Sequence, residues 1–160
     1  MSNSVNSLAL IIHLNERLFL HTLEGFTDDL AKKRISDHNN PFIWIATHTA
    51  WARFNMSMLL GKPMTNPYAG MFENFRPYAE TDQFPSLEKL KAEWKNASEQ
   101  VKDAIQNVTP EQLATDAQRG NPIGDSTIGG TLAFLAQHES YSIGQLAFLK
   151  KFYTNEAMKY

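Results

Sequence analysis

The stretch that decides the fold is TIGGTLAFLAQHESYSIGQL, residues 127–146. Its apolar residues recur at three- and four-residue spacing, which is the period of a helix with one face on a core. When His138 is placed at the centre of that face, Thr131, Phe134, Leu135, Tyr141, Ser142, Gln145 and Leu149 share its side. The core-directed face therefore carries His138, Ser142 and Gln145, and polar side chains need partners once they are buried.

Four segments of the chain have helical period, and none alternates like a long strand. They cover about residues 4–23, 41–60, 86–107 and 126–153. A short helix is expected at residues 109–113, where Thr109 and Gln112 match a capping box and Pro110 occupies the first turn. The chain is therefore predicted to be all-α, and residues 1–160 are predicted to form a single domain that is long enough to bury a core.

The connection between the second and third helices, residues 61–85, is too long for a simple antiparallel hairpin. A connection of this length in a four-helix bundle usually spans the bundle, so we expect these two helices to run parallel. The loop carries four aromatic residues, Tyr68, Phe72, Phe75 and Tyr78. They either anchor the loop to the bundle or form a lid or wall over a pocket at one open end.

A second histidine, His48, lies ninety residues upstream of His138 within the apolar stretch of residues 40–60. Trp44, Ile45, Trp51, Ala52, Asn55 and Leu59 share its helix face. Two imidazoles on core-directed faces of different helices predict a polar cluster inside the bundle. The cluster is either a self-satisfied hydrogen-bond network or the floor of a pocket, and the predicted pocket residues are Asn55, Ser142, Gln145, Tyr141 and Trp51.

Imidazole is a common ligand of zinc, nickel, iron and copper. A catalytic zinc commonly takes three protein ligands, and histidines at positions i and i+4 of one helix plus one from a neighbouring helix give that geometry. Here His48 and His138 supply two, whereas position i+4 from His138 is Ser142, a poor ligand. Glu139 points about 100° away from His138 on the helix, so we do not expect it to substitute. The predicted metal is a weakly held Zn²⁺ or Ni²⁺ on two histidines.

The composition excludes several classes of function. The chain has no cysteine, which excludes disulfides, thiolate ligands and a cysteine nucleophile and fits a reducing compartment. It shows neither a signal peptide nor an apolar run of about 20 residues, so we expect a cytoplasmic protein that does not enter a membrane. With 17 acidic and 15 basic residues and no basic stripe, it is not expected to bind nucleic acid.

Residues 127–146 resemble the last core helix of the DinB/YfiT-like superfamily, whose hallmark there is His-Glu-x-x-His-x-Gly-Gln. Residues 40–48, followed by Leu59-Leu60-Gly61, are similar to that family's second helix, and the resemblance covers the whole chain in order and spacing. It implies a four-helix bundle with up-down-down-up connectivity and frequent homodimers. The first helix fits a dimer contact, because Leu10, Leu14 and Leu20 are apolar off its main stripe.

The resemblance also implies a three-histidine site for a divalent metal at one end of the bundle. His48 falls on the first ligand position, His138 on the second and Ser142 on the third, while Gly144 and Gln145 are retained. The metal site is therefore expected to be degenerate.

Some members of that family are thiol-dependent transferases or isomerases that use low-molecular-weight thiols such as bacillithiol or mycothiol. Others have no known activity, and the founding name refers to DNA-damage induction. Three functions stay open for this chain. The first is a non-catalytic or small-molecule-binding, stress-related protein. The second is a metal-dependent (thiol-dependent) transferase or hydrolase that uses His48 and His138. The third is a metal-free enzyme with one of these histidines as general base.

Overall fold

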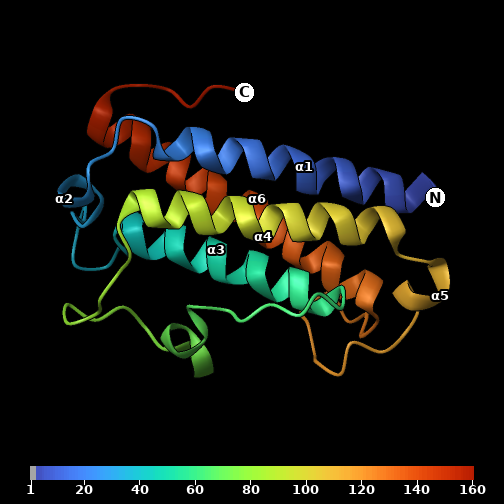
Figure 1. The fold of residues 1–160 in the computed structure, drawn as a ribbon. Helices are drawn as coiled ribbons and strands as arrows, with labels where there is room; N and C mark the ends of the chain where they lie inside the picture. Colours follow the sequence, from blue (N-terminus) through green and yellow to red (C-terminus); the bar gives the residue numbers. More distant parts are fainter. Residues whose placement is uncertain (1–2) are drawn as a thin grey trace.

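The computed structural model describes residues 3–160, with side chains from residue 6 onward. Its helices are α1 (Asn3–Leu23), α2 (Asp28–Ala31), α3 (Phe42–Leu59), α4 (Leu87–Asn107), α5 (Pro110–Leu113) and α6 (Ile128–Thr154), with two 3₁₀ turns, η1 (Ala69–Met71) and η2 (Glu73–Phe75), as Figure 1 shows. The described residues contain no strand, only an isolated bridge between Asp116 and Thr127. The prediction of an all-α chain is confirmed.

The helix ends follow from side chains at the caps. Ser86 Oγ accepts a hydrogen bond from the backbone at the start of α4, and Thr127 Oγ1 does the same for α6. The predicted capping box of Thr109 and Gln112 is formed in full at α5. Pro41 is the N-cap of α3 rather than its first helical residue. The four long helices lie within two residues of their predicted bounds, and for α4 and α6 the caps Ser86 and Thr127 explain where the helix begins.

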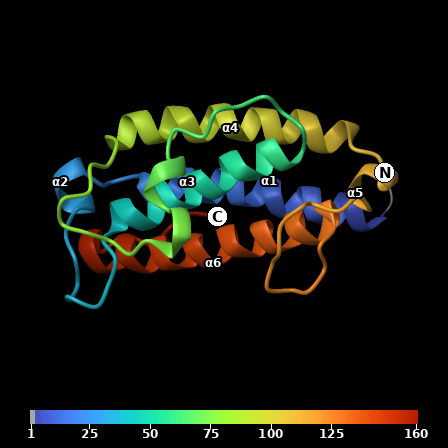
Figure 2. The same cartoon turned by 90° about the horizontal axis from the view of Figure 1, so that it is seen from below.

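The four long helices pack side by side, with α3 and α1 each lying against both α4 and α6 (Figures 1 and 2). Phe19 of α1 stacks on Trp94 of α4 with ring centroids 4.0 Å apart. Both rings are completely buried, and each such side chain stabilises the fold by about 2–3 kcal/mol. No helix within residues 3–160 has the length and hydropathy to cross a membrane.

Two loops lie on the same face of the bundle, the first over α3 and the second over the start of α6 (Figures 1 and 2). One is the α3–α4 connection, residues 60–86, and the other is the α5–α6 connection, residues 114–127. Tyr68 and Phe72 are buried and anchor the first loop, and the Tyr68 hydroxyl donates a hydrogen bond to Glu93 of α4. Phe75, in contrast, is fully exposed. The aromatic residues of this loop thus have different roles.

Candidate functional site

His48 of α3 and His138 of α6 face one another edge to face, with ring centroids 4.9 Å apart. Trp44 and Trp51, one helical turn to either side, stack on the His48 ring at centroid distances of 4.9 and 5.4 Å. Phe72 from the α3–α4 loop packs its edge against the same imidazole at 4.9 Å. The His48 ring is therefore held in one orientation by aromatic contacts alone, with its polar atoms left for another partner.

These rings line a cavity of about 700 Å³ between α3, α6 and the two loops. Its walls are mostly apolar, and the aromatic rings among the lining residues include Trp44, His48, Trp51, Phe72, Phe134 and His138. Pockets for small molecules commonly measure about 300–1,000 Å³ and combine apolar walls with a few polar groups. The cavity has the volume and the lining of such a pocket.

Neither imidazole forms a hydrogen bond with any described residue, and His138 Nδ1 is buried without a partner. Buried polar groups in folded proteins are nearly always paired, so groups without a protein partner indicate a place where a ligand or water binds. Of the two alternatives that the sequence leaves open, the structure therefore does not show a self-satisfied hydrogen-bond network around the two histidines.

Burial and, to a smaller extent, the neighbouring His138 together lower the pKa of His48 to about 4. Burial also lowers the pKa of His138. Both imidazoles are therefore neutral at neutral pH, with lone pairs that can accept a hydrogen bond or a proton. The interior of the cavity carries no net charge.

The structure brings together only part of the predicted pocket. Trp51 lines the cavity with the two histidines, whereas Asn55 accepts a hydrogen bond from Asn66 at 3.0 Å and lies outside it. Tyr141 and Gln145 are exposed and contact each other along a separate cleft. α6 runs obliquely past α3 in Figure 1. The face of α6 that meets α3 at His138 therefore no longer faces the cavity at Tyr141 and Gln145, one and two turns later.

Ser142, at the third ligand position, is buried and does not line the cavity in the structure. Among the described residues, no group of three His, Cys, Asp or Glu side chains converges as a metal site would require. The residues present therefore do not fit the three-ligand metal site that the family resemblance implies.

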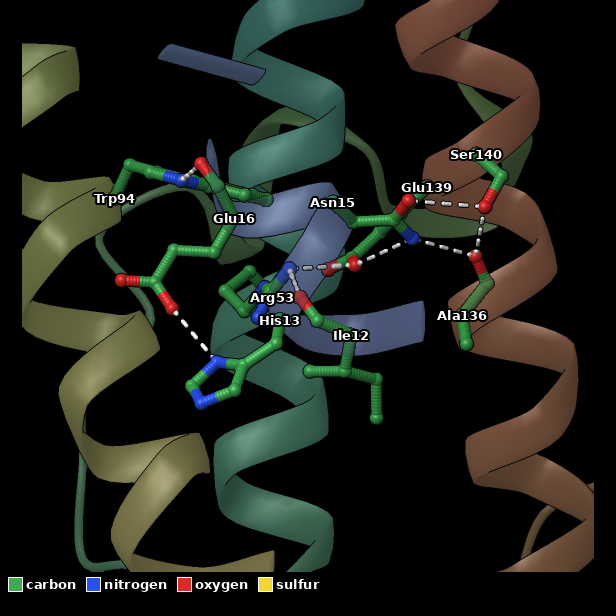
Figure 3. A network of polar contacts seen from close by, with 9 residues as sticks. All are labelled: Ile12, His13, Asn15, Glu16, Arg53, Trp94, Ala136, Glu139 and Ser140. Atoms are coloured by element: carbon green, nitrogen blue, oxygen red, sulfur yellow. Dashed lines mark hydrogen bonds and ion pairs between the residues drawn. The ribbon is translucent and has the colours of Figure 1, made fainter. Parts of the chain in front are cut away.

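Glu139 points away from the cavity, as its place on the helix predicts. Its carboxylate belongs to a polar network in the centre of the bundle (Figure 3). This network was not predicted from the sequence. Arg53 of α3 donates from Nη2 to Glu139 Oε2 at 2.7 Å, and the two side chains are 1% and 0% exposed. Asn15 of α1 donates to the same oxygen at 3.4 Å. The Arg53 guanidinium also lies over the Trp94 ring at 4.3 Å.

Desolvation raises the pKa of Glu139 to about 7, although Arg53 and Asn15 both act to lower it. The second carboxylate oxygen, Oε1, has no partner among the described residues, which is consistent with that shift. One signal for this network was present in the sequence. Arg53 is the one Lys, Arg, Asp or Glu residue of α3 and Glu139 is the one acidic residue of α6, and a charge buried in an apolar helix requires an opposite charge.

A solved structure described as a conserved protein from Enterococcus faecalis has the same fold, with a TM-score of 0.71 over 98% of this chain and 99% of that chain. The two sequences are 15% identical, so this likeness concerns the fold alone. None of the curated proteins matches the sequence. The family model described as the DinB superfamily matches residues 11–146, which is most of the chain. This protein therefore belongs to the DinB superfamily.

Proposed function

We propose that this protein binds a small molecule in the aromatic cavity and is a non-catalytic, stress-related member of its family with a degenerate metal site. One observation carries the proposal. Two neutral imidazoles without hydrogen-bond partners open into a cavity of about 700 Å³ with aromatic walls, and the described residues supply no third metal ligand beside them. Such a site supplies hydrogen-bond acceptors and stacking surfaces, which is what an uncharged, flat part of a ligand needs.

The test is a thermal-shift screen with small aromatic molecules on the wild type and on His48→Ala, His138→Ala and His13→Ala. His13 is exposed on α1, and Glu16 is its only polar partner among the described residues, so it is the matched control. Ligands that raise the melting temperature of the wild type and of His13→Ala, but much less that of the cavity variants, support the proposal. Equal shifts in all four proteins contradict it.

The second candidate is a divalent-metal-dependent (thiol-dependent) transferase or hydrolase that uses His48 and His138. The observation in its favour is the 4.9 Å separation of the two rings, which places two good ligands side by side. Two neutral histidines without a third ligand give a low affinity, so this candidate requires a ligand that the described residues do not supply. Elemental analysis of purified protein at stoichiometric level distinguishes the two candidates.

We further propose up-down-down-up connectivity for the four long helices. In Figure 1, α1 and α6 run toward the end of the bundle where α2 lies, whereas α3 and α4 run away from it. The 27-residue α3–α4 connection, residues 60–86, has the length that a crossover between parallel helices needs.

A homodimer is also proposed. Leu10 and Leu14 of α1 and Tyr141, Phe148 and Phe152 of α6 are exposed, although such large apolar side chains favour burial. A second copy of the chain that packs against these side chains would bury part of their apolar surface. Sedimentation velocity is expected to show a dimer for the wild type and a monomer for Phe148→Glu. A monomeric wild type contradicts the proposal.

A further inference from the structure

The charged residues of the cavity lie at its rim rather than in its interior. Glu73 and Arg76 come from the α3–α4 loop, and Arg119 comes from the α5–α6 loop, which flanks the same face of the bundle (Figure 2). The other lining residues are aromatic, apolar or uncharged polar groups, including the two neutral histidines. A bound ligand therefore contacts aromatic side chains in the interior of the cavity and charged side chains only at the rim.

The two rim arginines are not equivalent. Arg76 pairs with Asp82, whose carboxylate also accepts a hydrogen bond from Ala79 N at 2.9 Å. Arg76 lines the cavity and Asp82 does not, so the charge of Arg76 is compensated by a carboxylate outside the lining while the guanidinium keeps further donors. Arg119 is exposed and forms no ion pair with any described residue. It is thus the rim cation with its full charge available.

The hydrogen-bonding groups of the rim favour an anion over a cation. Two guanidinium groups can donate hydrogen bonds there, and Arg119 has no compensating carboxylate among the described residues, whereas Glu73 supplies the single carboxylate of the lining. A guanidinium fork recognises a carboxylate through paired hydrogen bonds, which adds direction to the charge attraction. A cationic ligand would be repelled by Arg119 and would find only Glu73 as a partner.

We propose that the cavity selects a flat aromatic molecule that carries a carboxylate, with its ring system against the aromatic side chains that line the cavity and its anionic group on Arg119. This inference rests on the proposed function, because it names the chemical class of the ligand of the same cavity. Arg76 contributes further donors to the carboxylate, and Glu73 opposes it.

The experiment compares 2-naphthoate with its uncharged isostere 2-naphthamide, using NMR titration at pH 7.5 and low salt. The proteins are the wild type, Arg119→Gln, Glu73→Gln and the matched control Arg17→Gln, which removes an exposed arginine from α1. We expect the wild type to bind the carboxylate about three- to fivefold more tightly than the amide, a difference typical of a partly exposed charge pair. Arg119→Gln abolishes that preference, Glu73→Gln increases it, and Arg17→Gln leaves it unchanged.

Two outcomes overturn the inference and are distinguishable from each other. If naphthoate and naphthamide bind equally and Arg119→Gln changes neither, the charge selection is wrong while the cavity remains a small-molecule site. If neither compound binds and the screen described above also finds no cavity ligand, the proposed function fails together with the inference. The charge-dependent part of the affinity is further expected to weaken at 0.5 M salt, because salt screens interactions between exposed charges.

Discussion

Arg53 Nη2 lies 2.7 Å from Glu139 Oε2, and both side chains are buried where α1, α3 and α6 meet. Glu139 directly follows His138 in α6. His138 lines the cavity, whereas Glu139 points into the centre of the bundle. The ion pair links α3 to α6, the two helices that each contribute a histidine to the cavity.

The Arg53–Glu139 pair is predicted to respond unequally to the loss of either partner. Glu139→Leu leaves a buried guanidinium that cannot release its proton, and it is expected to cost about 3–5 kcal/mol of unfolding free energy. Arg53→Met is expected to cost less below pH 7, because an unpaired Glu139 can take up a proton. Urea denaturation of both single variants and the double variant measures these costs. Equal costs of the two single variants at pH 6 contradict the account.

The raised pKa of Glu139 also predicts a stability change with pH. The carboxyl group binds its proton up to about pH 7 in the folded protein, but only up to its ordinary value of 4.5 in the unfolded chain. The folded state therefore binds more protons between these values, and the contribution of Glu139 to stability falls as pH rises from 4.5 to 7. Unfolding free energies of the wild type and Glu139→Gln over this range test the sign. A slope that persists in Glu139→Gln assigns it to another group.

His48 is predicted to have the opposite effect. Its pKa is about 4 in the folded protein and 6.5 in the unfolded chain, so the unfolded state binds more protons between these values. Its contribution to stability is present above pH 6.5 and is lost as pH falls through about 4, to the extent of at most about 3 kcal/mol. NMR titration of the imidazole resonances gives the pKa directly. A His48 pKa near 6.5 would show that the ring is solvated.

The serine at the third ligand position is predicted to be the reason for weak metal binding. Ser142 lies one turn beyond His138 on the same helix, and an imidazole reaches farther than a hydroxymethyl group. Ser142→His is expected to bind Zn²⁺ at least about tenfold more tightly than the wild type by calorimetry, since it supplies a third ligand. Gln137→His, which adds an imidazole on the exposed side of α6, is the control. Equal gains in both variants contradict convergence of the three positions.

Phe72 and Phe75 offer a matched pair for the role of the α3–α4 loop. Phe72 is buried against Trp44, His48 and Trp51, so Phe72→Ala is expected to cost about 3 kcal/mol of unfolding free energy and to free the His48 ring. Phe75 is fully exposed, and Phe75→Ala is expected to change stability by less than about 0.5 kcal/mol. Thermal and urea denaturation measure both. Similar costs would mean that Phe72 does not anchor the loop.

The sequence predicted the helices well because their signals are local. Caps such as Ser86, Thr109 and Thr127 act on the backbone within three residues, and apolar periodicity needs only one helix. The meeting of His48 and His138 was also within reach, since both lie at the centres of core-directed faces. The angular position of a residue on one helix suffices for such an inference when the contact lies near the middle of the packed surface.

The remaining pocket residues could not be predicted in this way. Gln145 shares the angular position of His138, yet it is exposed because α6 runs obliquely past its neighbour two turns later. Asn55 is drawn into a hydrogen bond by Asn66, a loop residue whose position no periodic pattern describes. Crossing angles and loop paths depend on the packing of the whole bundle, and a single helix does not contain that information.

We infer that the cavity beside His48 and His138 binds a small molecule through neutral imidazoles and aromatic walls. The most direct measurement is an NMR titration of labelled protein with aromatic ligands, following the imidazole signals of His48 and His138 and the indole N–H signals of Trp44 and Trp51. We predict saturable shifts at these four residues, with the Trp94 indole unchanged because it is buried on the other side of α3, against α1. Ligand-induced shifts confined to other residues, or none at any ligand concentration, would contradict the account.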